Sequence, residues 1–418
     1  MTEREFAEII KEKGGTLYRV GGCVRDEIRG VTPNDIDFVV TGLEADQINL
    51  DKIVGQDFPV FHVTFEDLTS CEVALARKEK KNGKGYHGFT FFSDKNVTIE
   101  EDLARRDFTM NAMAKDVLTG KFIDPFDGAD SIRRKCIEAT SDAFVEDPLR
   151  VFRAARFAAQ FNFSLSGCTV GFMISMKDEL KDLKAERVWK EVMKALESKD
   201  PSIFFKYLSM VDCLNVWFPE VEALDVPDRH DGTAFNHTMN LLKYGKDALT
   251  RFGLLVHDFG KGLTPKEEHP FHREHDKMGK EAVNSFCDRL KTPEEFREVG
   301  VVCATNHMKA RRISEMRRGK AFKWYLQNKK RMDILLDVVL IDSTVREGVN
   351  LAKEVKEWAY VDGVMKEAQF VEKTVTGQSL IDAGETRKGS EFGNLLLQRR
   401  ISEFMKRRNE FDRKWGIS

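Results

Sequence analysis

The sequence predicts an α+β fold, in which a sheet-containing N-terminal region is followed by helices to the end of the chain. Apolar runs of strand length, separated by glycine and charged residues, fall at 17–20, 38–40, 58–63 and 72–77. Beyond residue 140 the apolar residues recur at helical spacing. A chain of 418 residues has room for two to four domains. We expect a head at 1–140, a helical neck and body at 141–228, a third domain at 229–347 and a helical tail at 348–418.

Net charge, cysteine content and hydropathy limit the kinds of protein that this chain can be. Charged residues make up 33% of the chain but leave a net charge of −2, so any contact with nucleic acid must come from local patches. The seven cysteines form no C-x-x-C pair, which predicts reduced thiols in a cytoplasmic protein. The most apolar late run, at 334–341, is short and contains Asp337, so it predicts a core helix and no membrane span.

The first element is predicted to be a helix that supports the strand after it. Thr2 and Glu5 have the spacing of a capping box, and Gly14 and Gly15 end the helical pattern.

Residues 16–42, TLYRVGGCVRDEIRGVTPNDIDFVVTG, hold the densest chemistry in the sequence. After the first strand, Gly21 and Gly22 let the backbone turn tightly and approach a ligand, because neither carries a Cβ. A short helix at 23–29 would direct its N-terminal N–H groups at an anion above these glycines.

Asp35 and Asp37 open the second predicted strand. Side chains two apart in a strand share a face, so these carboxylates would lie about 6.6 Å apart along the chain. Such a pair can hold hard divalent cations about 3.5 to 4 Å apart, as two-metal phosphoryl transfer requires. A lone D-x-D is more often a loop residue and a strand-edge residue. The upstream glycines and Arg25 favour the metal site.

This stretch resembles the nucleotidyltransferase signature of the polymerase-β-like superfamily. GGCVRD followed by DID is similar to the form found in tRNA CCA-adding enzymes and bacterial poly(A) polymerases. The resemblance implies a nucleotidyltransferase head in which Asp35 and Asp37 bind Mg²⁺ and carry catalysis. It also implies that Gly21, Gly22 and Arg25 bind the nucleotide.

Two segments after this pair have alternative interpretations. Glu72, in the fourth predicted strand region, is either a third carboxylate near the metals or a solvent-facing strand residue. The basic, glycine-rich run at 78–88 is either a solvated hairpin loop or a mobile flap that closes on phosphates or RNA.

The next motif follows a second predicted capping box, formed by Thr98 and Glu101. RRDFTMNAM resembles the family's second motif, which implies that Arg106 contacts the nucleotide. FIDPFDGADSI, at 122–132, resembles the third motif, whose Asp-Gly turns brace the end of the head.

The sequence VEDPLRVFRAARFAAQF, residues 145–161, predicts a helix with Asp147 at its N-cap and a proline at the first helical position. Arg150, Arg153 and Arg156 recur every three residues and spread over about 120° of one side. By itself, such an arginine-bearing side is usually a solvated face.

EDPLR resembles the motif that serves CCA-adding enzymes as a protein template for the incoming base. Cytosine and adenine show an amino donor beside an unprotonated ring nitrogen, which suits the acceptor Asp147 and the donor Arg150 and opposes uracil and guanine. By the same resemblance Arg153 and Arg156 bind the triphosphate. ERVWKE, at 186–191, resembles the fifth motif and is interpreted as helix packing.

A second pattern lies between 230 and 307, which holds seven of the nine histidines. His237, the adjacent His257 and Asp258 in HDFGKG, and a downstream histidine-rich loop resemble the HD metal-dependent phosphohydrolase domain. An adjacent His and Asp at a helix end can share one cation. The resemblance implies a divalent transition metal or Mg²⁺ at this site.

The remaining ligands of this second site follow from the family pattern. His275 is the preferred loop ligand and His272 the second choice, while His307 is a further candidate. For the final carboxylate Asp342 is nearest, although Thr344-Val-Arg stands where the family has Asp-Val-Arg.

The motifs span nearly the whole chain in family order, up to LLLQRRISEFMKRRNEFDRKW in the basic tail. They imply a bacterial-type multifunctional tRNA CCA-adding enzyme that uses CTP and ATP, with an HD domain acting on 2′-phosphate or 2′,3′-cyclic phosphate ends. A poly(A) polymerase and an A-adding-only enzyme share most of these motifs. A third alternative is an HD phosphohydrolase whose head only binds RNA.

Overall fold

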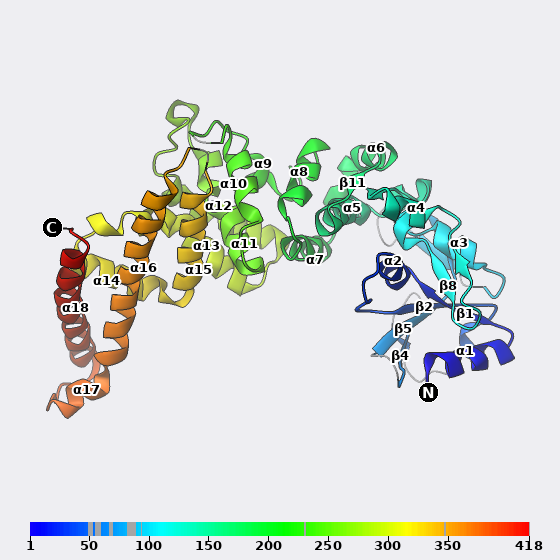
Figure 1. Cartoon of the computed structure of the whole chain (residues 1–418), viewed down its shortest axis with the longest axis horizontal. Coiled ribbons are helices and arrows are strands. Elements are labelled where there is room, and N and C mark those ends of the chain that lie inside the picture. Colours follow the sequence, from blue (N-terminus) through cyan, green and yellow to red (C-terminus); the bar gives the residue numbers. More distant parts are fainter. Residues whose placement is uncertain are drawn as a thin grey trace. The chain divides into compact units, whose positions relative to one another are not determined.

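The computed structural model covers the chain and describes residues 1–48, 53–54, 60–66, 70–81, 89–92, 94–229, 231–346 and 348–417. The chain forms two compact units, residues 1–216 and 217–418. Among the described residues, strands occur only in the first unit, mainly in its blue and cyan part (Figure 1). The predicted α+β class, with a helical remainder, is confirmed.

The first unit is built on a seven-stranded mixed sheet in the order β3-β4-β5-β2-β1-β8-β9. β2 and β5 are parallel, and the other neighbours are antiparallel. The strands are β1 (Thr16–Val20), β2 (Asp37–Thr41), β3 (Ile53–Val54), β4 (Val60–Thr64), β5 (Ser70–Leu75), β8 (Ala114–Asp116) and β9 (Phe122–Ile123). The parallel pairing places Asp37 opposite Glu72.

Two short ladders lie outside this sheet. β6 (Lys78–Lys81) pairs antiparallel with β7 (Phe89–Phe92), and β10 (Cys136–Ile137) pairs parallel with β11 (Ser164–Leu165). The predicted hairpin or flap at 78–88 therefore begins as β6, and residues 82–88 lie outside the described residues. Phe58, expected in a strand, also lies outside them.

Alternation along the central strands assigns the two faces of the sheet. Leu17 and Phe38 join the core on one face with residues of α1 (Glu3–Glu12), whereas Val20 and Val39 join the core that includes α3 (Ile99–Ala104). Asp37 is two residues from Val39 and shares its face. Both helices start with the predicted capping boxes. The local sequence thus sets which side of the sheet receives the acidic residue.

The rest of the first unit is helical. Its helices are α2 (Gly22–Ile28), α4 (Gly128–Arg133), α5 (Leu149–Phe161), α6 (Gly167–Ser175), α7 (Ala185–Leu196) and α8 (Ser202–Met210). α5 packs against α7 and α8. α5 begins at Leu149, one residue later than the predicted first helical position, and residues 142–146 before it form a 3₁₀ turn.

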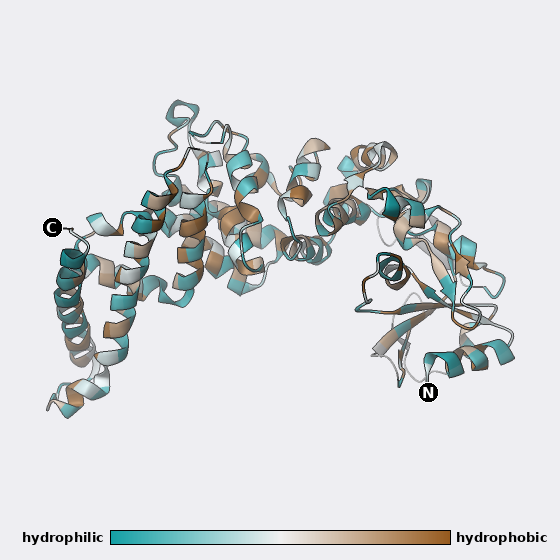
Figure 2. Cartoon of the chain, in the orientation of Figure 1, coloured by the Kyte–Doolittle hydropathy of each residue, from teal (hydrophilic) through white to brown (hydrophobic). Residues whose placement is uncertain are grey.

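The second unit consists of helices and short 3₁₀ turns. The helices are α9 (Pro219–Glu222), α10 (Ala234–Leu242), α11 (Ala248–Val256), α12 (His275–Leu290), α13 (Glu294–Arg311), α14 (Arg318–Asn328), α15 (Met332–Thr344), α16 (Leu351–Thr374), α17 (Gly377–Asp382) and α18 (Gly389–Lys414). Figure 2 shows long apolar stretches on α11 and α15, whereas α18 is largely hydrophilic. The apolar run at 334–341 lies within α15, as predicted. No helix in the described part of the chain is long and apolar enough to cross a membrane.

Candidate active sites

A cleft of about 1080 Å³ lies within the first unit. The turn after β1, the start of β2, and helices α2, α5 and α7 all contribute to its wall. Ten arginine and lysine side chains line it, against seven carboxylates. This excess of positive charge suits a polyanionic ligand.

The carboxylates expected to bind Mg²⁺ lie in the wall of this cleft. Asp37 is the first residue of β2, and Asp35 lies in the bend before it rather than in the strand. Burial within the cleft wall raises the pKa of Asp37, and the negative charges of Glu72 and Asp35 raise it further against the opposing charge of Arg106. A cation between these oxygens would relieve that repulsion, and an all-oxygen donor set fits Mg²⁺.

The glycine turn beside these carboxylates is closely packed. Gly21 has a φ of +71°, and a Cβ there would lie 2.8 Å from Nη1 of Arg106. Gly22 is the first residue of α2. Arg25, on the same helix, is buried, and its Nη1 donates to Oδ1 of Asn111 at 2.7 Å. The turn therefore depends on a residue without a side chain at position 21.

Arg106 is held by the fully buried carboxylate of Asp102. Its Nη2 donates to Oδ2 of Asp102 at 3.1 Å, while Arg105 donates to Oδ1 of the same residue. Burial alone would raise the pKa of Asp102, but the two guanidinium groups lower it overall. Nε of Arg106 is buried without a hydrogen-bond partner. Arg106 thus lies in the cleft wall as a fixed cation.

The two expected base-reading residues lie together on the cleft wall at the start of α5. Oδ1 of Asp147 accepts from the Leu149 N–H at 3.0 Å, so Asp147 does cap the helix although the helix starts later than predicted. Its Oδ2 accepts from Nη2 of Arg187 at 2.7 Å. Arg150 is buried and donates to the carbonyl oxygens of Ala143 and Arg105, each at 2.6 Å. Both side chains are therefore held in place by the protein.

Arg187 is a cleft residue to which the sequence interpretation gave no role. It belongs to the ERVWKE segment on α7, which was interpreted as helix packing. Its contact with Asp147 joins residues 40 apart in the chain. No local spacing predicts such a pair, and the only available signal was the segment's resemblance to the fifth motif.

The two arginines expected at the triphosphate each have a carboxylate partner. Nε of Arg153 donates to Oδ2 of Asp107 at 2.7 Å, and Arg156 pairs with Glu191 on α7. Burial would raise the pKa of Asp107, but mainly the charge of Arg153 lowers it to about 2. Arg156 also lies over the Phe157 ring, 3.8 Å from its centroid. Both cations line the cleft in fixed positions, and their contact with a triphosphate remains a prediction.

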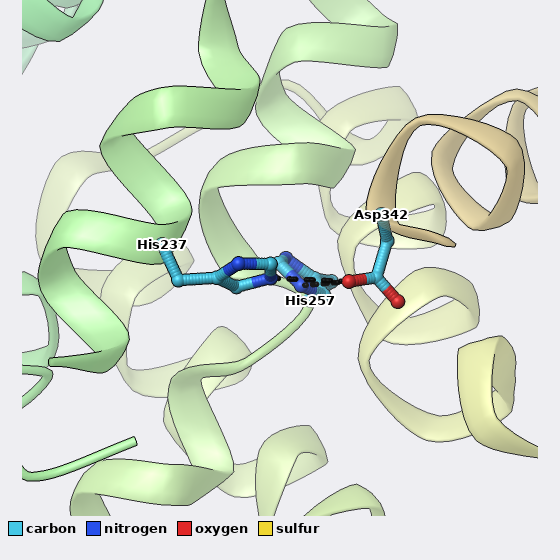
Figure 3. A group of neighbouring side chains, drawn as sticks. All are labelled: His237, His257 and Asp342. Atoms are coloured by element: carbon cyan, nitrogen blue, oxygen red, sulfur yellow. Dashed lines mark hydrogen bonds and ion pairs between the residues drawn. The ribbon is translucent and has the colours of Figure 1, made fainter. Parts of the chain in front are cut away.

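A second centre, in the second unit, gathers buried histidines and aspartates. Two groups of potential ligands are formed by His237, His257 and Asp342, and by Asp258, His275 and His307. Figure 3 shows that His237, His257 and Asp342 point toward one another from different helices. Nε2 of His237 lies 3.1 Å from Oδ1 of Asp342. Nε2 of His275 lies 3.2 Å from Oδ1 of Asp258.

Each histidine of this centre has an acceptor at its other ring nitrogen. Nδ1 of His237 lies 2.7 Å from the Asp231 carboxylate. Nδ1 of His257, His275 and His307 lies within 3.0 Å of the backbone oxygens of residues 254, 272 and 303. This arrangement keeps the proton on Nδ1 and leaves the Nε2 lone pair for a metal.

The electrostatics of this centre also fit a divalent cation. Nε2 of His257 is buried without a hydrogen-bond partner. Burial lowers the pKa of His307 to about 3, so its imidazole is neutral. The pKa of Asp258 lies well below its usual range although burial opposes this, because the His257 ring and the Lys261 ammonium lie beside it. A mixed set of imidazole and carboxylate donors suits a divalent transition metal.

The geometry distinguishes among the proposed ligands of this centre. His275 lies in the cluster, whereas both ring nitrogens of His272 bond elsewhere, to Thr264 and the Pro227 carbonyl. His307 and Asp342 lie in the cluster. Lys261 of HDFGKG was given no role in the sequence interpretation, yet its Nζ lies 2.8 Å from Asp258.

Comparisons with known proteins show which family this chain belongs to. Residues 17–138 match the family model described as poly A polymerase head domain, and 162–224 match the model described as probable RNA and SrmB-binding site of polymerase A. The chain is 36% identical, over 406 residues, to a multifunctional CCA protein of Xanthomonas euvesicatoria pv. vesicatoria (strain 85-10). That match covers 92% of this chain and 97% of the relative. This chain belongs to the multifunctional CCA protein family.

Solved CCA-adding enzymes have the same fold. The Bacillus stearothermophilus enzyme in complex with CTP matches with a TM-score of 0.62 and 21% identity, covering 99% of this chain and 98% of that one. The Thermotoga maritima enzyme complexed with tRNA matches with a TM-score of 0.57 and 20% identity, covering 96% and 90%. The membership in the multifunctional CCA family therefore rests on sequence and agrees with the fold of the whole chain.

Proposed function

We propose that this chain adds C, C and A to the 3′ end of tRNA from CTP and ATP, without a nucleic-acid template. The observation that carries the proposal is that a single basic cleft contains both the Asp35–Asp37 carboxylate pair and the Asp147–Arg150 pair. Extended identity to a multifunctional CCA protein supports the same activity.

In this mechanism Asp35 and Asp37 would hold Mg²⁺, with Glu72 opposite Asp37 as a third carboxylate. Bound Mg²⁺ supplies charge neutralisation at the triphosphate and at the attacking hydroxyl. The turn at Gly21 and Gly22 leaves room for phosphate oxygens close to the backbone.

The cations of the cleft would neutralise the rest of the triphosphate. Arg25, Arg106, Arg153 and Arg156 are each fixed by a protein partner, so their positions are set before nucleotide arrives. Preorganised charge of this kind stabilises a developing negative charge without reorganisation during the reaction.

The base reader would use the remaining hydrogen-bonding capacity of Asp147 and Arg150. A carboxylate has about four lone-pair positions, and the helix cap and Arg187 use two of those on Asp147. The guanidinium of Arg150 has five N–H groups, of which two donate to carbonyl oxygens. The pair therefore keeps an acceptor and a donor for cytosine and adenine.

Incubation with tRNA lacking its 3′ CCA and with each nucleotide singly, then together, tests this function. The proposal expects CTP-dependent addition of two residues, followed by one from ATP. A long run of A from ATP alone would instead indicate a poly(A) polymerase. Addition of A only to tRNA that already ends in CC would indicate an A-adding enzyme.

We also propose that the second centre is a metal-dependent phosphohydrolase for 2′-phosphate or 2′,3′-cyclic phosphate ends. Its ligands would be His237, His257, Asp258, His275 and Asp342, joined by His307, and its ion a divalent transition metal. The four available Nε2 atoms support this choice of ion over Mg²⁺. Hydrolysis of a 2′,3′-cyclic phosphate end after loading with Ni²⁺ or Co²⁺, and its loss on chelation, tests the assignment.

Domain limits and location complete the proposal. We place the head, the neck and body, the HD domain and the tail at 1–140, 141–228, 229–347 and 348–418. We expect the protein to act in the cytoplasm, where thiols remain reduced, because its seven cysteines form no disulfide in the described residues.

A further inference from the structure

Two arginines lie one helical turn beyond two ligands of the histidine centre. Arg311 follows His307 by four residues on α13, and Arg346 follows Asp342 by four residues just after α15. Residues four apart on a helix lie on the same face, one above the other. Arg311 therefore lies above His307 on α13, and Arg346 lies just past the end of the adjacent helix α15, since α13 packs against α15.

Both arginines contact the same carboxylate of the centre. Arg346 pairs through Nη2 with Oδ1 of Asp342, and its Nε donates to the Asp342 carbonyl at 2.7 Å. Nη1 of Arg311 lies 3.5 Å from Oδ2 of Asp342. Oδ1 of Asp342 is also the oxygen that faces Nε2 of His237, and Figure 3 shows this carboxylate directed at the histidines. The guanidinium groups thus reach the atoms that would bind metal.

The two arginines bring more positive charge than is needed to neutralise the Asp342 carboxylate. A divalent cation bound by Asp342 would itself balance the carboxylate, so two further guanidinium groups would leave positive charge beside the metal. Lys261 is more enclosed, because it lies between the carboxylates of Asp228 and Asp258 with a side-chain exposure of 11%. Arg311 and Arg346 are also partly exposed, with side-chain exposures of 25% and 16%, so a ligand can reach them from solvent.

We propose that Arg311 and Arg346 bind the phosphate group of the ester that the histidine centre hydrolyses. Guanidinium groups present paired N–H donors that match phosphate oxygens, and their charge does not depend on pH in the physiological range. Glu354, on α16, restrains the first of them, since Oε2 of Glu354 lies 3.6 Å from Nη2 of Arg311. The inference rests on the proposed phosphohydrolase function and names its phosphate-binding residues.

Phosphate binding to the full-length, Co²⁺-loaded protein tests the inference without turnover. Inorganic phosphate is titrated calorimetrically, and the visible absorption of the bound Co²⁺ reports whether the metal and its ligands are retained. Arg311→Ala and Arg346→Ala should each keep Co²⁺ and weaken phosphate binding roughly 10- to 100-fold, the range for one charge-assisted contact. Arg311→Lys and Arg346→Lys, which keep the charge, should show a smaller loss.

Two matched variants sharpen the test. Arg312→Ala removes the neighbouring arginine, which is exposed and pairs with Glu315, and should leave phosphate binding unchanged. Glu354→Gln removes the competing carboxylate and should tighten phosphate binding. The opposite signs expected at Arg311 and Glu354 would not result from general loosening of the fold.

The outcomes separate this inference from the proposed activity. Unchanged phosphate affinity in both alanine variants, or loss of Co²⁺ together with phosphate, overturns the inference, because the arginines would then only support the metal ligands. Phosphate binding that depends on both arginines in a wild-type protein that hydrolyses no phosphate ester would overturn the proposed activity and leave the binding site standing.

Discussion

Replacing Asp147 by asparagine should change which nucleotide is added more than how fast the protein adds it. Asp147 uses both oxygens in the structure, one for the Leu149 N–H and one for Arg187. An asparagine has a single acceptor oxygen and presents an amino group in place of the other. In either amide orientation one contact loses its acceptor and a donor enters the base-reading site.

The substitution should affect nucleotide discrimination more than the stability of the fold. The Asp147–Arg187 ion pair has side-chain exposures of 25% and 28%, so its loss should cost only about 1 kcal/mol of folding free energy. A mismatched charge-assisted hydrogen bond to a base in a desolvated pocket costs about 1.5 to 3 kcal/mol, or roughly 10- to 100-fold. The preference for CTP and ATP over UTP and GTP should fall by that factor.

The assay is kcat/KM for the four nucleotides on a tRNA that lacks CCA. Glu197→Gln is a matched control, because it makes the same change on another residue that lines the cleft. A variant at Asp147 that loses activity equally with all four nucleotides, with its preference intact, would refute the reasoning. The carboxylate would then serve the helix start and Arg187, and the base would be read elsewhere.

Further predictions concern other parts of the molecule. Asp37→Ala should abolish addition with tRNA affinity unchanged. The pKa of Asp37 is raised, so protons should compete with Mg²⁺ for this carboxylate at a higher pH than for an ordinary carboxyl group. At limiting Mg²⁺ the kcat/KM of the wild type should therefore fall, as the pH is lowered, before the usual carboxyl range is reached. Excess Mg²⁺ should shift this fall in kcat/KM to lower pH. Asp258→Ala should remove phosphohydrolase activity and leave CCA addition intact, which assays of both activities on one preparation would check. Affinity for tRNA should fall steeply with salt, with little dependence on acceptor-stem sequence, as filter binding across a salt series would show. The pKa of Asp107 falls from 3.8 to about 2 on folding, so its ionised form should contribute about 2 kcal/mol above pH 4. That contribution should be lost as pH falls toward 2. The free energies of unfolding of the wild type and of Asp107→Asn, measured in urea, should therefore become equal near that pH.

The helices and strands could be predicted because the sequence patterns that specify them involve residues close together in the chain. Capping boxes at Thr2 and Thr98, and alternation in β1 and β2, concern residues within a few positions of one another. α5 begins one residue later than predicted, at Leu149, although Asp147 caps it as predicted. Propensity therefore identified the helix but not its first residue.

The sites were less predictable, because their decisive contacts are tertiary. Arg187 reaches Asp147 across 40 residues, and nothing in ERVWKE indicates that partner. The doubt between Asp342 and the Thr344 position could not be resolved by counting along the chain. In the structure it is Asp342 whose side chain joins His237 and His257. A helix turns about 100° per residue, so a shift of two positions would direct a side chain to a different face.

The two centres differ in donor atoms, and this difference bears on how one chain can keep two metal chemistries apart. The head offers carboxylate oxygens from Asp35, Asp37 and Glu72, a set that suits Mg²⁺ and has low affinity for soft ions. The second centre offers four imidazole nitrogens with their protons fixed on the opposite ring atom. Mg²⁺ rarely takes such ligands, whereas transition metals bind them strongly. We therefore propose that each centre selects its own ion by chemistry that is already present in the folded chain. A transition-metal chelator should accordingly stop phosphate-ester hydrolysis at concentrations that leave Mg²⁺-dependent nucleotide addition running.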